Sequence, residues 1–302
     1  MLLPQTLLAQ NVAQTAASSR VEQAERFRLE TPQQQNGLLP AFALDQAPPS
    51  PGDLDLGEQV ILRRREKQTP FKLFADVSGF YTSNAALTDR SAHDDFFLVA
   101  QVGVTYQTRI ATDLYAEATV RQATFRYARF DELDFDSLNA GAGLTYIARP
   151  LWGLAFSMRY NFNRLTDGSQ HDEFFRQHTL TVGVQKTFEL SKAHYVYAGY
   201  SSIFGWGVPV APERDEHGIY LGYHANLSRS ISADLSYRIA LFDYVHGRDD
   251  WNQNLVLAVK WDVKRWLSIS ASASGGFNRS NHEVFNYNVF TGGVGVFCTI
   301  AF

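Results

Sequence analysis

Residues 98–106 read LVAQVGVTY, and this stretch decides the fold. One parity carries Leu98, Ala100, Val102, Val104 and Tyr106, and the other carries Gln101, Gly103 and Thr105. Side chains that alternate with a period of two residues lie on opposite faces of a β-strand. The stretch therefore predicts a strand with one apolar face and one polar face.

The same alternation recurs in short segments from residue 70 to residue 302. Twelve such segments begin near residues 70, 95, 112, 136, 152, 176, 194, 217, 231, 252, 265 and 286. Long polar connections, such as residues 84–95, alternate with tight turns, such as Arg149 and Pro150. Transmembrane barrels have short turns at one end and longer loops at the other. The pattern therefore predicts an all-β fold, a twelve-stranded antiparallel transmembrane β-barrel over residues 70–302.

Composition excludes several classes of protein. The chain has 302 residues, of which 45% are apolar and 19% are charged, so disorder throughout is excluded. No window approaches the 18 or so consecutive apolar residues that a membrane-spanning helix needs. A single Cys rules out an internal disulfide and a Cys-based zinc site. The net charge of −4 gives no reason to expect a nucleic-acid partner.

The apolar faces of the predicted strands need a cover, and no second set of elements supplies it. We expect lipid to cover them, with the sheet closed because an open edge in hydrocarbon leaves N–H and C=O groups unpaired. Six aromatic residues on the apolar parity beside the short turns are predicted to form a periplasmic girdle: Tyr106, Tyr146, Trp152, Phe188, Trp261 and Phe302. The connections predicted as external loops are acidic, with Asp94, Asp95, Asp131, Glu132, Asp134, Asp172, Glu173, Asp215, Glu216, Asp249 and Asp250.

Residues 1–69 differ from the rest, with a glutamine cluster at 33–35 and a proline-rich stretch at 48–51. We interpret them as a mostly disordered periplasmic leader. Residues 1–9 resemble the end of a secretory signal peptide, although no basic region precedes them. Residues 10–69 are a candidate binding segment for a periplasmic protein partner.

The last strand carries a resemblance to known proteins. Residues 288–302 read NVFTGGVGVFCTIAF, alternate apolar residues and end on Phe302. This ending resembles the terminal strand of Gram-negative outer-membrane β-barrel proteins of the porin-like kind. The resemblance implies a place in the bacterial outer membrane, contact with its lipid and lipopolysaccharide, and recognition by the barrel-assembly machinery through the C-terminal strand. It implies no particular activity.

Polar residues on the opposite parity are predicted to line a lumen: Lys72, Asp76, Glu117, Arg121, Arg159, Asn161, Asn163, His224, Asn226, Asp234, Arg238, Asn254 and Lys260. Twelve strands about 4.8 Å apart and tilted by about 40° give a backbone diameter of roughly 24 Å and a channel of roughly 10 Å at most. We expect a narrow channel for passive passage of small polar solutes. The alternative is a non-conducting barrel that anchors or assembles a periplasmic or surface complex through its leader.

An enzyme is not expected. Twelve-stranded outer-membrane phospholipases carry a His-x-Ser pair on one strand, and this sequence has none. Imidazole stands next to carboxylate at His93-Asp94, His171-Asp172 and His282-Glu283, but all three pairs fall in predicted polar loops. We therefore predict no catalytic residues, no metal site and no cofactor.

Overall fold

The computed structural model describes residues 69–89, 92–210 and 212–302. The strands are β1 (Phe71–Thr82), β2 (Asp95–Ala111), β3 (Leu114–Tyr127), β4 (Phe135–Ala148), β5 (Leu154–Asp167), β6 (Glu173–Ser191), β7 (His194–Val208), β8 (Arg214–Asn226), β9 (Ile231–Tyr244), β10 (Arg248–Lys264), β11 (Leu267–Ser280) and β12 (Tyr287–Ala301). Short 3-10 helices lie at η1 (Asp131–Leu133), η2 (Arg149–Leu151) and η3 (Glu283–Phe285). Among these residues, no helix is long and apolar enough to cross a bilayer.

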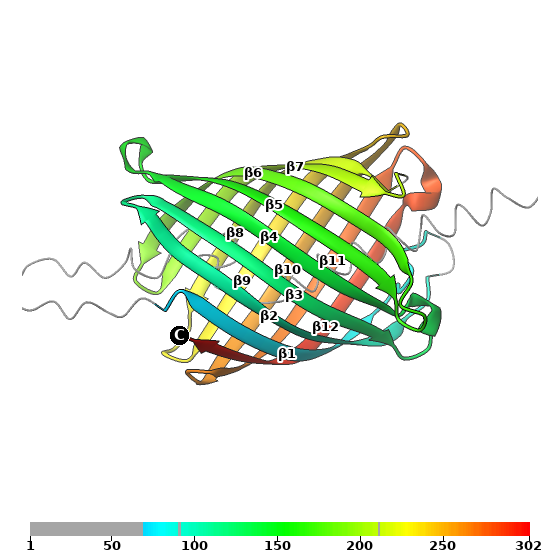
Figure 1. Ribbon diagram of the computed structural model, residues 1–302, viewed down its shortest axis with the longest axis horizontal. Helices are drawn as coiled ribbons and strands as arrows, with labels where there is room; N and C mark the ends of the chain where they lie inside the picture. The colour runs from blue at the N-terminus through cyan, green and yellow to red at the C-terminus, as the bar shows by residue number, and fades with distance from the viewer. Residues whose placement is uncertain (1–68, 90–91, 211) are drawn as a thin grey trace, which may run out of the picture.

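The sheet closes on itself. Each strand pairs antiparallel with its neighbours in chain order, and β1 also pairs with β12 (Figure 1). The closing register runs from Lys72 opposite Ala301 to Thr82 opposite Thr291. Closure removes the unpaired edges that hydrocarbon cannot satisfy. The predicted twelve-stranded antiparallel barrel is confirmed, whereas the predicted leader, residues 1–69, lies outside the described residues except for Thr69.

The barrel has two unlike ends. The turn end carries the connections 112–113, 149–153, 192–193, 227–230 and 265–266, and the loop end carries 83–94, 128–134, 168–172, 209–213, 245–247 and 281–286. The predicted alternation in length holds only in part, because the connection 245–247 is shorter than the turn 227–230. The strands reach farther than predicted: β8 begins at Arg214 and β10 at Arg248, and both residues pair with Tyr244 of β9.

The outer face of the barrel is apolar and exposed. Val102, Leu221 and Leu257, on three separate strands, each leave about half of their surface uncovered. A soluble protein rarely leaves a contiguous apolar surface of this size in water. No described element covers this face, so its cover is lipid. The chain is therefore a transmembrane barrel of the bacterial outer membrane.

Glycines on the interior face make room for aromatic rings from the next strand. An added Cβ on Gly222 of β8 would lie 2.0 Å from a ring carbon of Tyr197 on β7. In the opposite direction, a Cβ on Gly199 of β7 would lie 2.3 Å from the hydroxyl of Tyr220 on β8. Each tyrosine therefore lies flat against the wall, which keeps large rings out of the middle of the barrel.

Candidate functional site

The barrel interior is the candidate site. The thirteen residues predicted to line a lumen all share the buried parity of their strands, as the alternating exposure shows. Their exposure varies along the barrel: His224 and Asn254 are buried, whereas Asn226, at the turn end of β8, is exposed. Their role in lining a conducting pore stays a prediction.

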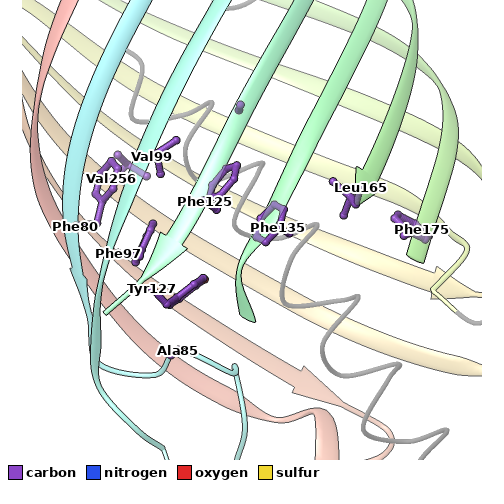
Figure 2. Packing of buried hydrophobic residues seen from close by; sticks show 11 residues of the cluster. Phe80, Ala85, Phe97, Val99, Phe125, Tyr127, Phe135, Leu165, Phe175 and Val256 are labelled. Atoms are coloured by element: carbon purple, nitrogen blue, oxygen red, sulfur yellow. The ribbon is translucent and has the colours of Figure 1, made fainter. Parts of the chain in front are cut away.

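Apolar side chains cover one side of the interior at the loop end (Figure 2). We call this cluster the apolar wall; its members are Phe80, Ala85, Phe97, Val99, Ala123, Phe125, Tyr127, Phe135, Leu165, Phe175 and Val256. All of them except Val256 come from β1–β6 and the connection that follows β1. The ring centroids of Phe125 and Phe135 lie 4.3 Å apart in a stacked arrangement. Sequence reasoning missed this wall.

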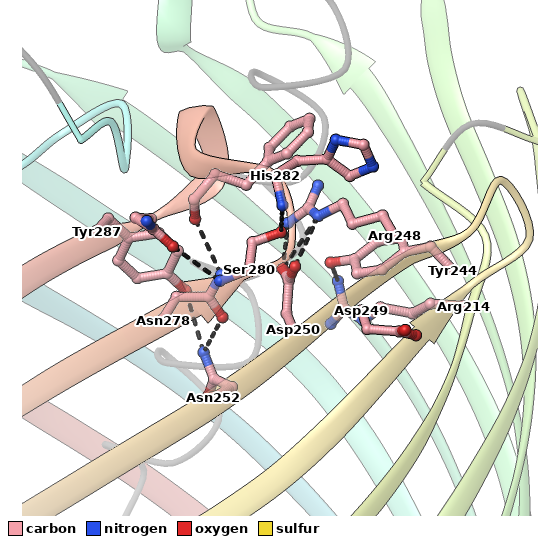
Figure 3. Close-up of polar contacts among 12 residues, drawn as sticks. Arg214, Tyr244, Arg248, Asp249, Asp250, Asn252, Asn278, Ser280, His282 and Tyr287 are labelled. Atoms are coloured by element: carbon pink, nitrogen blue, oxygen red, sulfur yellow. Dashed lines mark hydrogen bonds and ion pairs between the residues drawn. The ribbon is translucent and has the colours of Figure 1, made fainter.

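A row of arginines and aromatic rings occupies the other side of the loop end (Figure 3). We call it the arginine stack; it consists of Arg214, Arg238, Arg248, Phe242, Tyr244 and Phe285. The Cζ atom of Arg248 lies 3.5 Å from the ring centroid of Phe285 and 4.1 Å from that of Tyr244. Arg214 lies 4.3 Å from the ring centroid of Phe242, and Arg238, farther in, lies 5.8 Å from the same centroid. A guanidinium over a ring face gains cation–π attraction, which strengthens when the pair is desolvated.

Two buried carboxylates hold the arginine stack together. Glu216 accepts hydrogen bonds from Arg214, with the ion pair at 2.7 Å, and from Arg238 at 2.9 Å. Asp250 accepts from Nε of Arg248 at 2.9 Å and from Nδ2 of Asn278 at 2.9 Å. The five charged side chains thus carry three positive and two negative charges. The prediction that Glu216 and Asp250 lie in external loops is wrong, because both lie on the interior face of strands that extend farther than expected.

Arg238 is held in a fixed place but is incompletely bonded. Its guanidinium lies over Gly218, where an added Cβ would be 3.0 Å from Nε. Among the described residues, its Nη1 is buried with no hydrogen-bond partner, and so is Oδ1 of Asn254, the residue paired with Arg238 across the sheet. A buried donor without a partner calls for a bound water, ion or solute group.

The half of the interior toward the turn end carries charges of both signs. Glu117 of β3 pairs with Arg159 of β5, whose Nε also donates to Oδ1 of Asn161 at 2.9 Å. On the opposite side, Nδ1 of His224 lies 2.9 Å from Oδ2 of Asp234. The interior here is therefore polar, and the buried Asp234 and the part-buried Glu117 each have a partner within the wall, as burial requires.

The connection 83–94 folds inward at the loop end. Leu87 is buried and packs with Tyr287 and Val289 on the interior face of β12. Asn84 fixes the bend, since its Nδ2 donates to the backbone carbonyl of Thr88 at 2.8 Å and to that of Asn288 at 3.2 Å, and its Oδ1 accepts from the N–H of Thr88. This connection therefore narrows the loop end of the interior.

The six residues of the predicted girdle all lie exposed near the turn end. Trp152, at 84% exposed, projects farthest, from a left-handed backbone position after η2. A second set of exposed aromatics, which the sequence analysis did not single out, lies near the loop end: Phe96, Trp206, Trp251, Phe277 and Phe290. Aromatic belts at both edges of an apolar band are typical of a bilayer-spanning barrel.

The three adjacent His–acid pairs lie in connections at the loop end, as predicted: His93-Asp94, His171-Asp172 and His282-Glu283. Nδ1 of His171 lies 3.4 Å from Oδ2 of Asp136 on β4. On the outer face, Nδ1 of His217 lies 2.7 Å from the hydroxyl of Ser202 and 3.0 Å from that of Tyr200. Both hydroxyls share one ring nitrogen and Ser202 is buried, so these contacts satisfy polar groups beside lipid. In the described part of the chain, no group of three or more His, Cys, Asp or Glu side chains could hold a metal ion.

The closed sheet, the apolar outer face and the polar interior together define an outer-membrane β-barrel. No protein-family model matches the chain, and comparison with curated protein sequences gives no match either.

Solved structures do resemble it. The COG4313 outer membrane channel from Pseudomonas putida F1 superposes with a TM-score of 0.56 at 8% identity, over 82% of this chain and 100% of that one. The anion-selective porin from Comamonas acidovorans gives a TM-score of 0.42 at 9% identity, over 76% of this chain and 98% of that one. At 8% identity, the similarity to the Pseudomonas putida channel shows a shared fold alone.

Proposed function

We propose that the protein is an outer-membrane channel that lets small polar solutes pass passively through its interior, with the loop end external. A continuous run of polar side chains carries this proposal. Ser232, Asp234, Ser236 and Arg238 follow one another on the interior face of β9, from the turn end toward the arginine stack. A path of this kind offers hydrogen bonds to a hydrated solute along its length. The first structure described above is likewise titled an outer membrane channel.

Conductance in planar bilayers tests the proposal, with solute uptake by liposomes that contain the full chain as a second measurement. Two neighbouring substitutions form a matched pair, because Ser236 faces the interior whereas Leu235 is exposed on the outer face. We expect Ser236→Trp to lower the conductance strongly and Leu235→Trp to leave it unchanged. A purified, folded barrel that passes neither ions nor a pentose contradicts the proposal.

The alternative is a non-conducting barrel that anchors a complex through residues 10–69, of which only Thr69 is among the described residues. Deletion of residues 10–69 separates the two functions. A full chain that is silent in bilayers, together with loss of a co-purifying protein on the deletion, would favour the anchor.

A further inference from the structure

The two sides of the interior differ in chemistry at the same level of the barrel. β3 and β9 lie six strands apart in either direction around the closed sheet, so they face each other across the interior. At the loop end, β3 contributes Phe125 and Tyr127 to the apolar wall, and β9 contributes Phe242 and Tyr244 to the arginine stack. An apolar surface therefore faces a row of guanidinium groups.

The apolar wall itself offers a solute no charge, and among its side chains only Tyr127 carries a polar atom. Val99, Phe125 and Leu165 are buried side chains without polar atoms. Acidic residues on this side are bonded within the barrel: Oδ1 of Asp76 accepts from Nε2 of Gln101 at 2.8 Å. At the loop end, the carboxylate of Asp95 accepts from the backbone N–H groups of Phe96, Arg129 and Phe130. Its charge is therefore directed at the backbone of the loop end and away from the apolar wall.

The opposite side offers positive charge. Glu216 and Asp250 supply two negative charges against three guanidinium groups, and Nη1 of Arg238 is a buried donor that has no partner in the part of the chain that the structure describes. Guanidinium groups bind carboxylates with short, charge-assisted hydrogen bonds. The stacking of these guanidinium groups on rings fixes their planes and limits the entropy lost when an anion binds.

We infer that the loop end of the interior binds organic anions that carry an apolar body, such as an aromatic carboxylate, with the carboxylate at Arg238 and the ring toward the apolar wall. A site of this kind, mostly apolar with a few placed polar groups, is the usual form of a small-molecule site. The inference rests on the proposed channel and narrows its solutes to one chemical class.

Three probes separate the contributions of charge and of the ring. Benzoate has both, acetate has the charge alone, and benzylammonium has the ring with the opposite charge. We would measure their binding by calorimetry to the full chain in nanodiscs, with empty nanodiscs as the blank. Benzoate should bind at least about tenfold more tightly than either of the others. Acetate or benzylammonium binding as tightly as benzoate would overturn the inference.

Substitutions locate the site. Arg238→Gln removes the charge while Glu216 keeps its pair with Arg214, and we expect benzoate binding to fall to the level of acetate. Arg229→Gln, in the turn 227–230 at the other end, removes the same charge and should change nothing. Leu165→Asn keeps the number of side-chain heavy atoms and should also weaken benzoate binding, whereas Leu165→Met should not. If Leu165→Asn does not fold, the Arg238→Gln variant is the deciding test. Benzoate binding that is unchanged in Arg238→Gln overturns the inference.

The proposed channel and the proposed anion site can fail independently of each other. A barrel that conducts ions and passes a pentose but does not prefer benzoate contradicts this inference and leaves the channel standing. A barrel that binds benzoate but is silent in bilayers contradicts the channel.

Discussion

Arg238 of β9 reaches over Gly218 of β8, so that a Cβ added to this glycine would lie 3.2 Å from Nη2, the atom that donates to Glu216. The absent side chain is thus what allows the guanidinium to reach its carboxylate. Two residues on neighbouring strands together set the position of the innermost charge of the arginine stack.

Gly218→Val should therefore displace Arg238 from Glu216. We expect a loss of stability of about 1–3 kcal/mol from overpacking, and a weaker preference for anions. The reversal potential across a KCl gradient measures the preference. Gly79→Ala is the control, because no atom lies within 4 Å of the added Cβ. An unchanged reversal potential in Gly218→Val would show that the position of Arg238 does not set selectivity.

Asp250→Asn should destabilise the barrel by about 3–5 kcal/mol, because it leaves the buried guanidinium of Arg248 without its counter-charge. Asp250 is 1% exposed and also accepts from Asn278, so little water reaches it. Urea unfolding of the protein in detergent, followed by tryptophan fluorescence, measures the loss. The neighbouring Asp249 is exposed, and Asp249→Asn should have almost no effect. Equal stability of the two variants would contradict a structural role for the Arg248–Asp250 pair.

Asn84→Ala should release the connection 83–94 from the interior and raise the single-channel conductance. The substitution removes three hydrogen bonds to backbone groups, each worth about 0.5–1.5 kcal/mol. Asn281 makes comparable bonds to the backbone of Gly247 and Asp249, away from the connection 83–94, and Asn281→Ala serves as the control. A conductance that does not rise would mean that this connection does not limit the pore.

Phe302→Ser should lower the amount of barrel assembled in cells and leave refolding in detergent nearly unchanged. The ring of Phe302 stacks on that of Phe71 at 5.8 Å, so the folded barrel loses one exposed contact only. Phe290→Ser alters a comparably exposed ring at the other end of β12 and is the control. Heat-modifiable migration on gels measures assembly. Equal assembly of both variants would contradict recognition through the chain end.

The strands and their faces could be predicted because a period of two residues survives wherever one face meets lipid. The arginine stack could be predicted only in part. Arg238 follows the parity of β9, but Arg214 and Glu216, like Arg248 and Asp250, fall in acidic stretches beside Gly or Pro that are typical of loops. The signal that could have found them is the Arg-x-acid spacing, which places both charges on one face of a strand.

The apolar wall could not be predicted from parity. Parity places Phe97 and Val99 inward, but Phe96, Phe97, Leu98 and Val99 are apolar on both faces of β2, so the alternation gives no sign that an apolar cluster forms inside the barrel. The register with β3 forms it: Phe97 pairs with Tyr127 and Val99 with Phe125, and these four residues are buried together. Such pairing joins segments far apart in the chain, which a local pattern does not record.

The seam between β1 and β12 brings Phe71 and Phe302 within mutual backbone hydrogen bonds, at 2.9 and 3.2 Å. An even number of strands returns the polypeptide to the rim from which it started. Any domain fused ahead of the first strand and any tag appended after the last one would therefore share a compartment. A short linker that joins Phe302 to Phe71, with new termini opened at residues 245–247, should yield a circularly permuted barrel with the same twelve strands.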